Sequence, residues 1–289
     1  MRITTEWGRA ARVGRWAVAV AVLAAIAGSG VAMAARTKGV SHRTTVPGQS
    51  LGSATAKCKR GSAAVAAGFQ APGFDPDNSS STVARVSSSL IGNRRVKTRA
   101  FNFGTQEGDL VSFAYCRRAA HPPRVRSNSV SLLGGATGSA VAKCPKGNEA
   151  VGGGFKGGFS MSGGQAVIAL TSKRLGDRQW RVEGFNAGGA PADLVGYAYC
   201  KHTRHGLVTR SKRTTAPTDQ LRTFAVSCPR GGRAVAGGFD GHLSGSGPVT
   251  GAGAVTSKRT DHRTAWRTSA VGAFGQPGTI TGYAYCRTS

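Results

Sequence analysis

Three segments of the sequence align without a gap. They read CKRGSAAVAAGF at residues 58–69, CPKGNEAVGGGF at 144–155 and CPRGGRAVAGGF at 228–239. Three shorter segments align downstream, FAYC at 113–116 and YAYC at 197–200 and 283–286. The first cysteines, Cys58, Cys144 and Cys228, are almost evenly spaced, and so are the second, Cys116, Cys200 and Cys286. The chain is therefore built from three copies of one unit, and every expectation about its fold follows from this repetition.

Positions between the cysteines keep the same register. Trp180 and Trp266 precede their closing cysteines by the same interval, where the first copy has Val96. Asn102 and Asn186 also share one interval to theirs. We place the copies at 41–118, 125–202 and 210–288 and call them repeats one, two and three.

The local pattern within each repeat is that of β-strands. Residues 53–58 and 224–228 alternate in side-chain character, which is typical of a half-buried strand. Residues 229–232 read Pro-Arg-Gly-Gly, a turn, and 234–239 return as the second strand of a hairpin. Three further candidate strands bring the expected number to about five in each repeat of about 85 residues. No sustained helical period follows residue 35.

We therefore predict an all-β fold of three tandem antiparallel modules, each closed by one disulfide. The alternative is a single pseudo-threefold body, and the sequence leaves both arrangements open. Six cysteines allow 15 pairings, of which the repeat favours Cys58–Cys116, Cys144–Cys200 and Cys228–Cys286. Zinc binding by these cysteines is not expected, because no C-x-x-C occurs and the favoured partners lie far apart in the sequence. No metal site is expected.

The N-terminus has the pattern of a secretory signal. Four arginines precede a purely apolar stretch at 16–27, and Ala32-Met33-Ala34 offers small residues for cleavage. We expect residues 1–34 to be a signal peptide, after which no membrane span remains. The alternative is an uncleaved N-terminal anchor at 17–35, which is long enough to cross a bilayer. Both a cleaved signal peptide and a retained anchor predict that the repeats lie outside the cytoplasm.

Composition excludes some classes of protein and leaves charge as the main clue to function. The 43 glycines follow no three-residue period, which excludes a collagen, and the single apolar run excludes a polytopic membrane protein. The chain has 39 Lys+Arg against 12 Asp+Glu, a formal charge of +27. Without residues 1–34 the charge is +24. A surface of this kind concentrates polyanions.

The cations cluster near the expected borders between repeats, in segments without acids. These candidate polyanion-binding residues are Arg117, Arg118, Arg124, Arg126, Lys201, Arg204, Arg210, Lys212 and Arg213. Nucleic acid is not an expected partner, because few aromatic residues interleave the clusters and export removes the usual ligand. Anionic polymers of a cell wall are the expected partner.

No catalytic constellation repeats with the fold, and we expect no catalytic residue. The histidines occupy no equivalent positions, and the nucleophile motif G-x-S-x-G is absent. Residues 152–157 match G-x-G-x-x-G by letter, but they form part of a predicted glycine-rich strand with no helix after it. No cofactor is expected.

The pattern C-P-[KR]-G-x-x-A-V-x-G-G-F, then Trp, then Y-A-Y-C resembles a repeat of secreted actinobacterial proteins, most of them uncharacterised. The resemblance covers residues 41–289 and is specific for the module, not for an activity. Repeat one departs from it at Lys59, Ala67 and Val96. A weaker likeness, at the level of fold, is to the β-prisms of vitelline membrane outer layer proteins, although their acidic stretch before the closing cysteine is missing here.

These observations lead to one expected function and two alternatives. The expected function is a secreted, non-catalytic protein of the cell envelope or extracellular space that contacts anionic wall polymers through basic linkers. The second reading is a structural or matrix protein that self-associates. The third is a secreted hydrolase.

Overall fold

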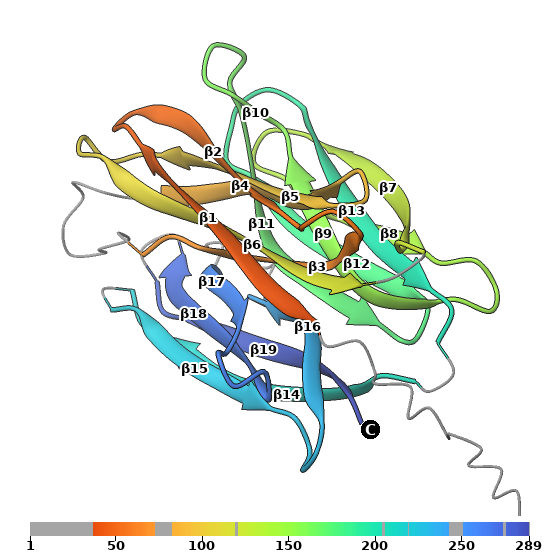
Figure 1. The fold of residues 1–289 in the computed structure, drawn as a ribbon. Coiled ribbons are helices and arrows are strands. Elements are labelled where there is room, and N and C mark those ends of the chain that lie inside the picture. Colours follow the sequence, from red (N-terminus) through yellow and green to blue (C-terminus); the bar gives the residue numbers. More distant parts are fainter. Residues whose placement is uncertain are drawn as a thin grey trace, which may run out of the picture. The chain divides into compact units, whose positions relative to one another are not determined.

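A computed structural model describes residues 37–72, 83–118, 121–203, 206–218, 220–242, 251–273 and 276–288 (Figure 1). The expected signal peptide at 1–34 and the alternative anchor at 17–35 lie outside these ranges. Residues Ala35–Ser289 form one compact unit. The described ranges hold strands and turns, and no helix among them is long and apolar enough to span a membrane. The all-β prediction is confirmed.

In the described ranges each repeat supplies the same series of six strands, and repeat two adds the two-residue β10. Repeat one forms β1 (Lys38–Val46), β2 (Ser50–Lys57), β3 (Ser62–Gln70), β4 (Val83–Ile91), β5 (Arg95–Asn102) and β6 (Gly108–Arg118). Repeat two forms β7 (Arg124–Leu132), β8 (Thr137–Lys143), β9 (Glu149–Gly157), β10 (Phe159–Ser160), β11 (Gln165–Leu175), β12 (Gln179–Asn186) and β13 (Ala192–Lys201). Repeat three forms β14 (Val208–Ala216), β15 (Arg222–Ser227), β16 (Arg233–Asp240), β17 (Gly251–Arg259), β18 (Ala265–Ala273) and β19 (Gly278–Arg287).

The expectation of about five strands in each repeat misses the first one. β1, β7 and β14 begin a few residues before the expected boundaries and are largely exposed along their length. A strand that presents no apolar face lacks the alternation by which strands are recognised in a sequence. The glycine-rich residues 152–157 lie in β9, as predicted.

Three antiparallel sheets are each shared between two repeats. Sheet A has the order β1-β6-β3-β17-β18-β15, so repeat one supplies half and repeat three the other half. Sheet B, β2-β5-β4-β9-β13-β7, joins repeats one and two, and sheet C, β14-β19-β16-β11-β12-β8, joins repeats three and two. The repeats therefore do not form three separate modules. Each one is divided between two sheets, as the pseudo-threefold alternative requires.

The halves of each sheet meet over a short ladder. β3 pairs with β17 at Gln70–Thr256 and Phe69–Ser257, and β4 with β9 and β11 with β16 pair over two residues each in the same way. The phenylalanines of these ladders, Phe69, Phe155 and Phe239, are almost completely buried. Their rings meet edge to face, with centroids 5.9 to 6.1 Å apart. One aromatic residue from every repeat thus forms the centre of the core.

Three buried tyrosines also join the repeats to one another. The hydroxyl of Tyr115 accepts a hydrogen bond of 2.6 Å from the backbone N–H of Arg259. Tyr199 accepts one of 2.9 Å from Leu90, and Tyr285 one of 2.7 Å from Arg174. Each tyrosine belongs to one repeat and its donor to another, so the bonds connect all three repeats in a cycle.

One disulfide closes each repeat. The bonds join Cys58 with Cys116, Cys144 with Cys200 and Cys228 with Cys286, which are the pairs that the repeat favours. Each links the turn after the second strand to the end of the last strand. Disulfides of this kind are typical of proteins that fold in an oxidising compartment.

Candidate polyanion-binding surface

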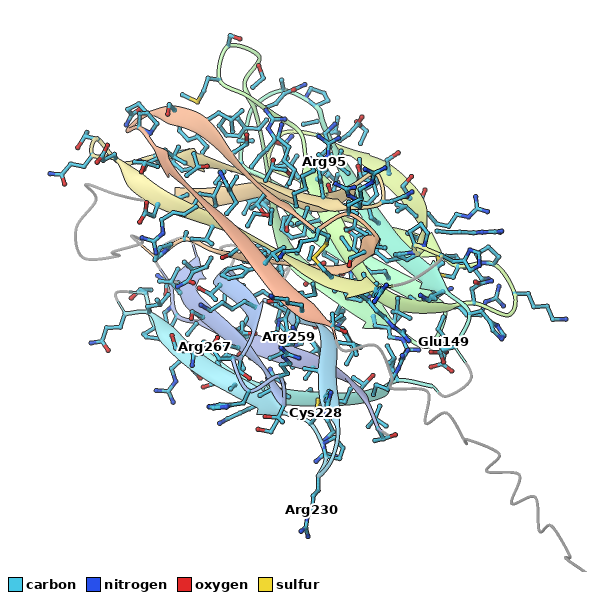
Figure 2. The ribbon with its side chains drawn as sticks, in the orientation of Figure 1. Arg95, Glu149, Cys228, Arg230, Arg259 and Arg267 are labelled. Atoms are coloured by element: carbon cyan, nitrogen blue, oxygen red, sulfur yellow. A yellow bond between two sulfur atoms is a disulfide. The ribbon has the colours of Figure 1, made fainter. Side chains whose placement is uncertain are left out.

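The first strand of every repeat lies at the border of a sheet. β1, β7 and β14 each have one neighbour, which is β6, β13 and β19 respectively. Their outer edges have no partner strand among the described residues, and side chains project into solvent from the borders of the sheets (Figure 2). Charged side chains on a border strand hinder pairing with the edge of another sheet.

Five of the candidate polyanion-binding residues belong to these border strands. Arg124 and Arg126 are in β7, and Arg210, Lys212 and Arg213 are in β14. All five side chains are exposed. Their pattern in the sequence indicates linkers, whereas the structure places them in regular strands, where the pleat fixes their spacing.

Three other candidates lie at the ends of strands next to the closing cysteines. Arg117 and Arg118 end β6, and Lys201 ends β13. Arg118 is exposed, whereas Arg117 and Lys201 are half-buried. Arg124 stands opposite Cys200 in the β7–β13 ladder, one position from Lys201 along that ladder. Arg204, the ninth candidate, lies outside the described residues.

Arg117 and Lys201 lie within electrostatic range of a third cation, which is absent from the predicted set. Arg287, at the end of β19, is also half-buried, and these three residues form what we call the cation triad. Burial lowers the pKa of Lys201, and the positive charges of Arg117 and Arg287 lower it further. Burial and Arg117 likewise lower the pKa of Arg287. Three like charges are therefore held close enough to repel one another.

The triad could have been found in the sequence. Each of its residues directly follows a closing cysteine, so the three occupy one position of the aligned repeats. A pseudo-threefold arrangement brings such positions together, whereas separate modules would keep them apart. The aligned cations are visible in the sequence, but their proximity could be inferred only by choosing between separate modules and a pseudo-threefold body, which the sequence left open. The cations of β14 lie farther along that strand, opposite Ala284, Gly282 and Thr281.

The charge of this surface is compensated only in part, by Glu149, whose negative charge acts to raise the pKa of Arg287 against burial and Arg117. Within the described ranges, none of the eight candidate cations placed there forms an ion pair. Lys201 donates a hydrogen bond of 3.2 Å to the carbonyl of His121. Glu149 faces Lys201 across the β9–β13 ladder, but it accepts a hydrogen bond of 2.7 Å from Thr203 and lies 3.7 Å from Arg174.

Two further observations concern metals and relatives. Among the residues that the structure describes, no group of three His, Cys, Asp or Glu side chains is arranged to hold a metal ion. No protein-family model matches the chain, and no curated protein has a matching sequence.

Proposed function

We propose that the protein is an extracellular, non-catalytic binding protein for anionic polymers of the cell wall. Its contacts are the exposed cations of β7 and β14 together with the cation triad. The observation that carries this proposal is the absence of carboxylate partners for the described cations of this surface. Surface cations without partners remain available to phosphate groups of a polymer.

Physical considerations support multivalent electrostatic binding. A chain with a charge of +24 after signal removal attracts polyanions over long distances and releases their counterions on contact. The cations occupy borders of different sheets, so a long polymer can engage more than one border at once. Linked weak contacts of this kind raise the total affinity without any new contact.

The same cations argue against the self-associating alternative. An unpaired sheet border is the place where two copies of a β-protein would join, and charged side chains along it prevent that pairing. β14 presents Arg210, Lys212 and Arg213 at its border. Two such borders would repel each other. A matrix role would require association through another surface.

Co-sedimentation of residues 35–289 with purified cell walls tests the proposal. We expect saturable binding that is lost when teichoic acid is removed and that weakens as salt is raised. Changing Arg210, Lys212 and Arg213 together to Gln should reduce the affinity and lower the slope of log affinity against log salt, by roughly one for each lost phosphate contact.

The matched control removes three exposed cations from other border strands. Lys57 of β2, Lys143 of β8 and Arg222 of β15 are suitable, because all three are exposed and the change in net charge is the same. This variant should bind walls more tightly than the β14 variant. No binding at low salt, or equal losses in both variants, would contradict the proposal.

A further inference from the structure

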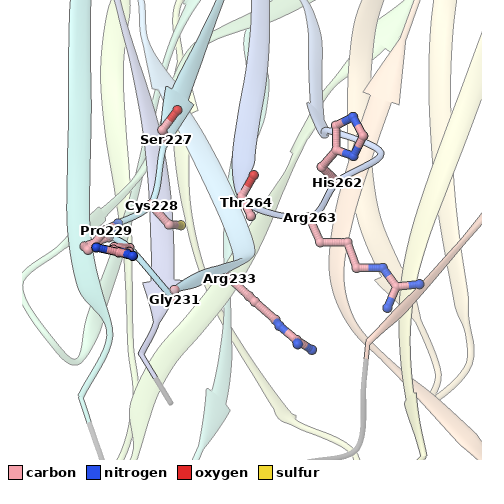
Figure 3. Close-up of a pocket in the computed structure, with 10 residues that line it drawn as sticks. Ser227, Cys228, Pro229, Gly231, Arg233, His262, Arg263 and Thr264 are labelled. Atoms are coloured by element: carbon pink, nitrogen blue, oxygen red, sulfur yellow. The ribbon is translucent and has the colours of Figure 1, made fainter.

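Repeat three contains a groove beside its first cysteine. The cavity measures about 570 Å³ and lies between two turns (Figure 3). One wall is the turn that follows β15, at residues 227–233, and the other is the turn between β17 and β18, at 262–264. This volume is within the range of small-molecule sites, about 300–1,000 Å³.

A comparison with repeat two explains why the groove is open. Arg178 of repeat two occupies the position of Thr264, counted back from the closing cysteine of each repeat. Its Nε and Nη2 atoms donate hydrogen bonds of 3.2 and 3.0 Å to the carbonyl of Cys144, so its side chain lies across the turn. Repeat one also has an arginine here, Arg94. Thr264 is too short to cover the turn, and the space remains empty of protein.

The groove is lined by three arginines and one histidine. Arg230 and Arg233 come from one turn, and His262 and Arg263 from the other, and no lining residue is acidic. Figure 3 shows the side chains of Arg233 and Arg263 extending to the same side of the groove, and Figure 2 shows Arg230 reaching out from the end of its turn. Across the described ranges, no carboxylate pairs with any of these three arginines.

Two of these arginines, Arg233 and Arg263, are specific to this repeat. The position of Arg233 is held by Glu149 in repeat two, and the position of Arg263 by Asp177. One backbone hydrogen bond is nevertheless shared, because the carbonyl of Asp177 accepts from the N–H of Ala150 just as that of Arg263 accepts from Ala234. These two aligned positions therefore carry opposite charge in the two repeats.

The backbone of the second turn holds Arg263 in an uncommon conformation. The turn spans 260–264, and its counterpart in repeat two is shorter, at 176–178. Arg263 has a φ of 61°, a value that costs free energy for any residue other than glycine. Its N–H donates to the carbonyl of Thr260 at 3.0 Å, and the N–H of Thr260 donates to Ala265 at 3.0 Å. These bonds fix the turn that presents the guanidinium group.

We infer that this groove binds a phosphate-type oxyanion, with Arg233 and Arg263 as its principal ligands and Arg230 and His262 at its rim. Guanidinium groups match the oxygens of a phosphate with paired, charge-assisted hydrogen bonds. The phosphate is either a phosphodiester of a wall polymer or a free ion. If the ligand is the phosphodiester of a wall polymer, the inference rests on the proposed function and adds a specific site to it. If the ligand is a free ion, the inference is independent of the proposed function.

The decisive variant is Thr264→Arg. It restores the arginine that repeats one and two carry, so the fold should tolerate it. It should close the groove by bonding to the carbonyl of Cys228, as Arg178 bonds to that of Cys144. It also adds one positive charge. Binding that depends on total charge becomes tighter in this variant, whereas binding in the groove is lost.

The experiment is calorimetric titration of residues 35–289 with inorganic phosphate and, separately, with a short poly(glycerol phosphate). We expect Thr264→Arg and Arg233→Gln each to weaken binding by roughly tenfold or more, since a hydrogen bond to a charged group is worth about that factor. Thr137→Arg, an exposed site on β8, adds the same charge elsewhere and should leave binding unchanged or slightly tighter. Binding of the polymer but not of free phosphate identifies a phosphodiester ligand.

Equal or tighter phosphate binding by Thr264→Arg would overturn the groove assignment. Wall binding by the unaltered protein is measured in parallel. If walls bind but Thr264→Arg has no effect on either ligand, the groove assignment fails and the proposed function stands. If walls do not bind but phosphate does, and Thr264→Arg abolishes it, the proposed function fails and the groove remains a phosphate site.

Discussion

Gly153 of β9 lies directly against the indole ring of Trp180. A Cβ atom added to Gly153 would overlap Cδ2 of that ring, and one added to Gly237 would overlap the ring of Trp266 in the same way. Repeat one has Ala67 at the glycine position and Val96 at the tryptophan position. The two positions therefore change together within one chain, because only a smaller partner leaves room for the methyl group.

This relationship predicts a steric conflict. Gly153→Ala should lower the free energy of unfolding by about 1–3 kcal/mol, the usual effect of forcing extra volume into a packed core. The same change in a Trp180→Val background should have almost no further effect, because that pair already exists as Ala67 and Val96. Urea denaturation of the four proteins of this double-mutant cycle measures the coupling. Additive effects of the two substitutions would show that the contact between Gly153 and Trp180 does not cause the loss of stability.

The tyrosine bonds between repeats predict a loss of stability shared by the whole unit. Tyr285→Phe leaves the buried N–H of Arg174 without its acceptor, which should cost about 1–3 kcal/mol. The matched control is Tyr197→Phe, since this half-buried tyrosine stands where repeat one already has Phe113. Thermal unfolding should remain a single transition, shifted to lower temperature by Tyr285→Phe and nearly unchanged by the control. Separate transitions for individual repeats would contradict this account.

Alkaline pH should unfold the protein through the same tyrosines. Burial raises the pKa of Tyr115, Tyr199 and Tyr285 well above the usual value of 10.0. Their neutral form is favoured in the fold, so their contribution to stability is complete below pH 10 and is lost as pH rises toward the folded-state pKa values. Ultraviolet absorbance of tyrosinate should therefore appear together with the loss of β-sheet circular dichroism. Ionisation of all five tyrosines before unfolding would disprove the burial of these hydroxyls.

The disulfides should each contribute a similar amount to stability. The paired cysteines are 58, 56 and 58 residues apart, so the chain-entropy account assigns each bond about 4 kcal/mol. Replacing Cys144 and Cys200 together by Ala should lower the free energy of unfolding by about this amount in urea denaturation. Mass spectrometry of the unaltered protein without reductant should find no free thiol. A free thiol would contradict the pairing.

Strand content and disulfide pairing could be predicted because both depend on local pattern and repetition. The repeated asparagines, by contrast, have a structural role that only the three-dimensional contacts explain. Buried Asn186 donates from Nδ2 to the carbonyls of Leu132 and Ala190 and accepts from the N–H of Gly188, which ties a loop to the first strand of the repeat. Asn102 makes the corresponding bonds in repeat one.

Two features could not be predicted, for different physical reasons. The exchange of strands between sheets depends on ladders of two residues, such as Phe69–Ser257, whose members look ordinary in the sequence. The groove of repeat three depends on a side chain that Thr264 does not have. A search for sequence patterns detects residues that are present. This groove is recognised only by comparison with repeat two, where Arg178 bonds to the carbonyl of Cys144 and covers the equivalent turn.

The division of each repeat between two sheets has a consequence for synthesis. β3 is among the first strands to be made, whereas its neighbour β17 belongs to the last repeat, with Phe69 paired to Ser257. Sheet A can be completed only after β18 has also left the ribosome. A chain truncated before that point has two sheets without their full set of strands. Sheet A therefore forms late in folding, when repeat three reaches repeat one.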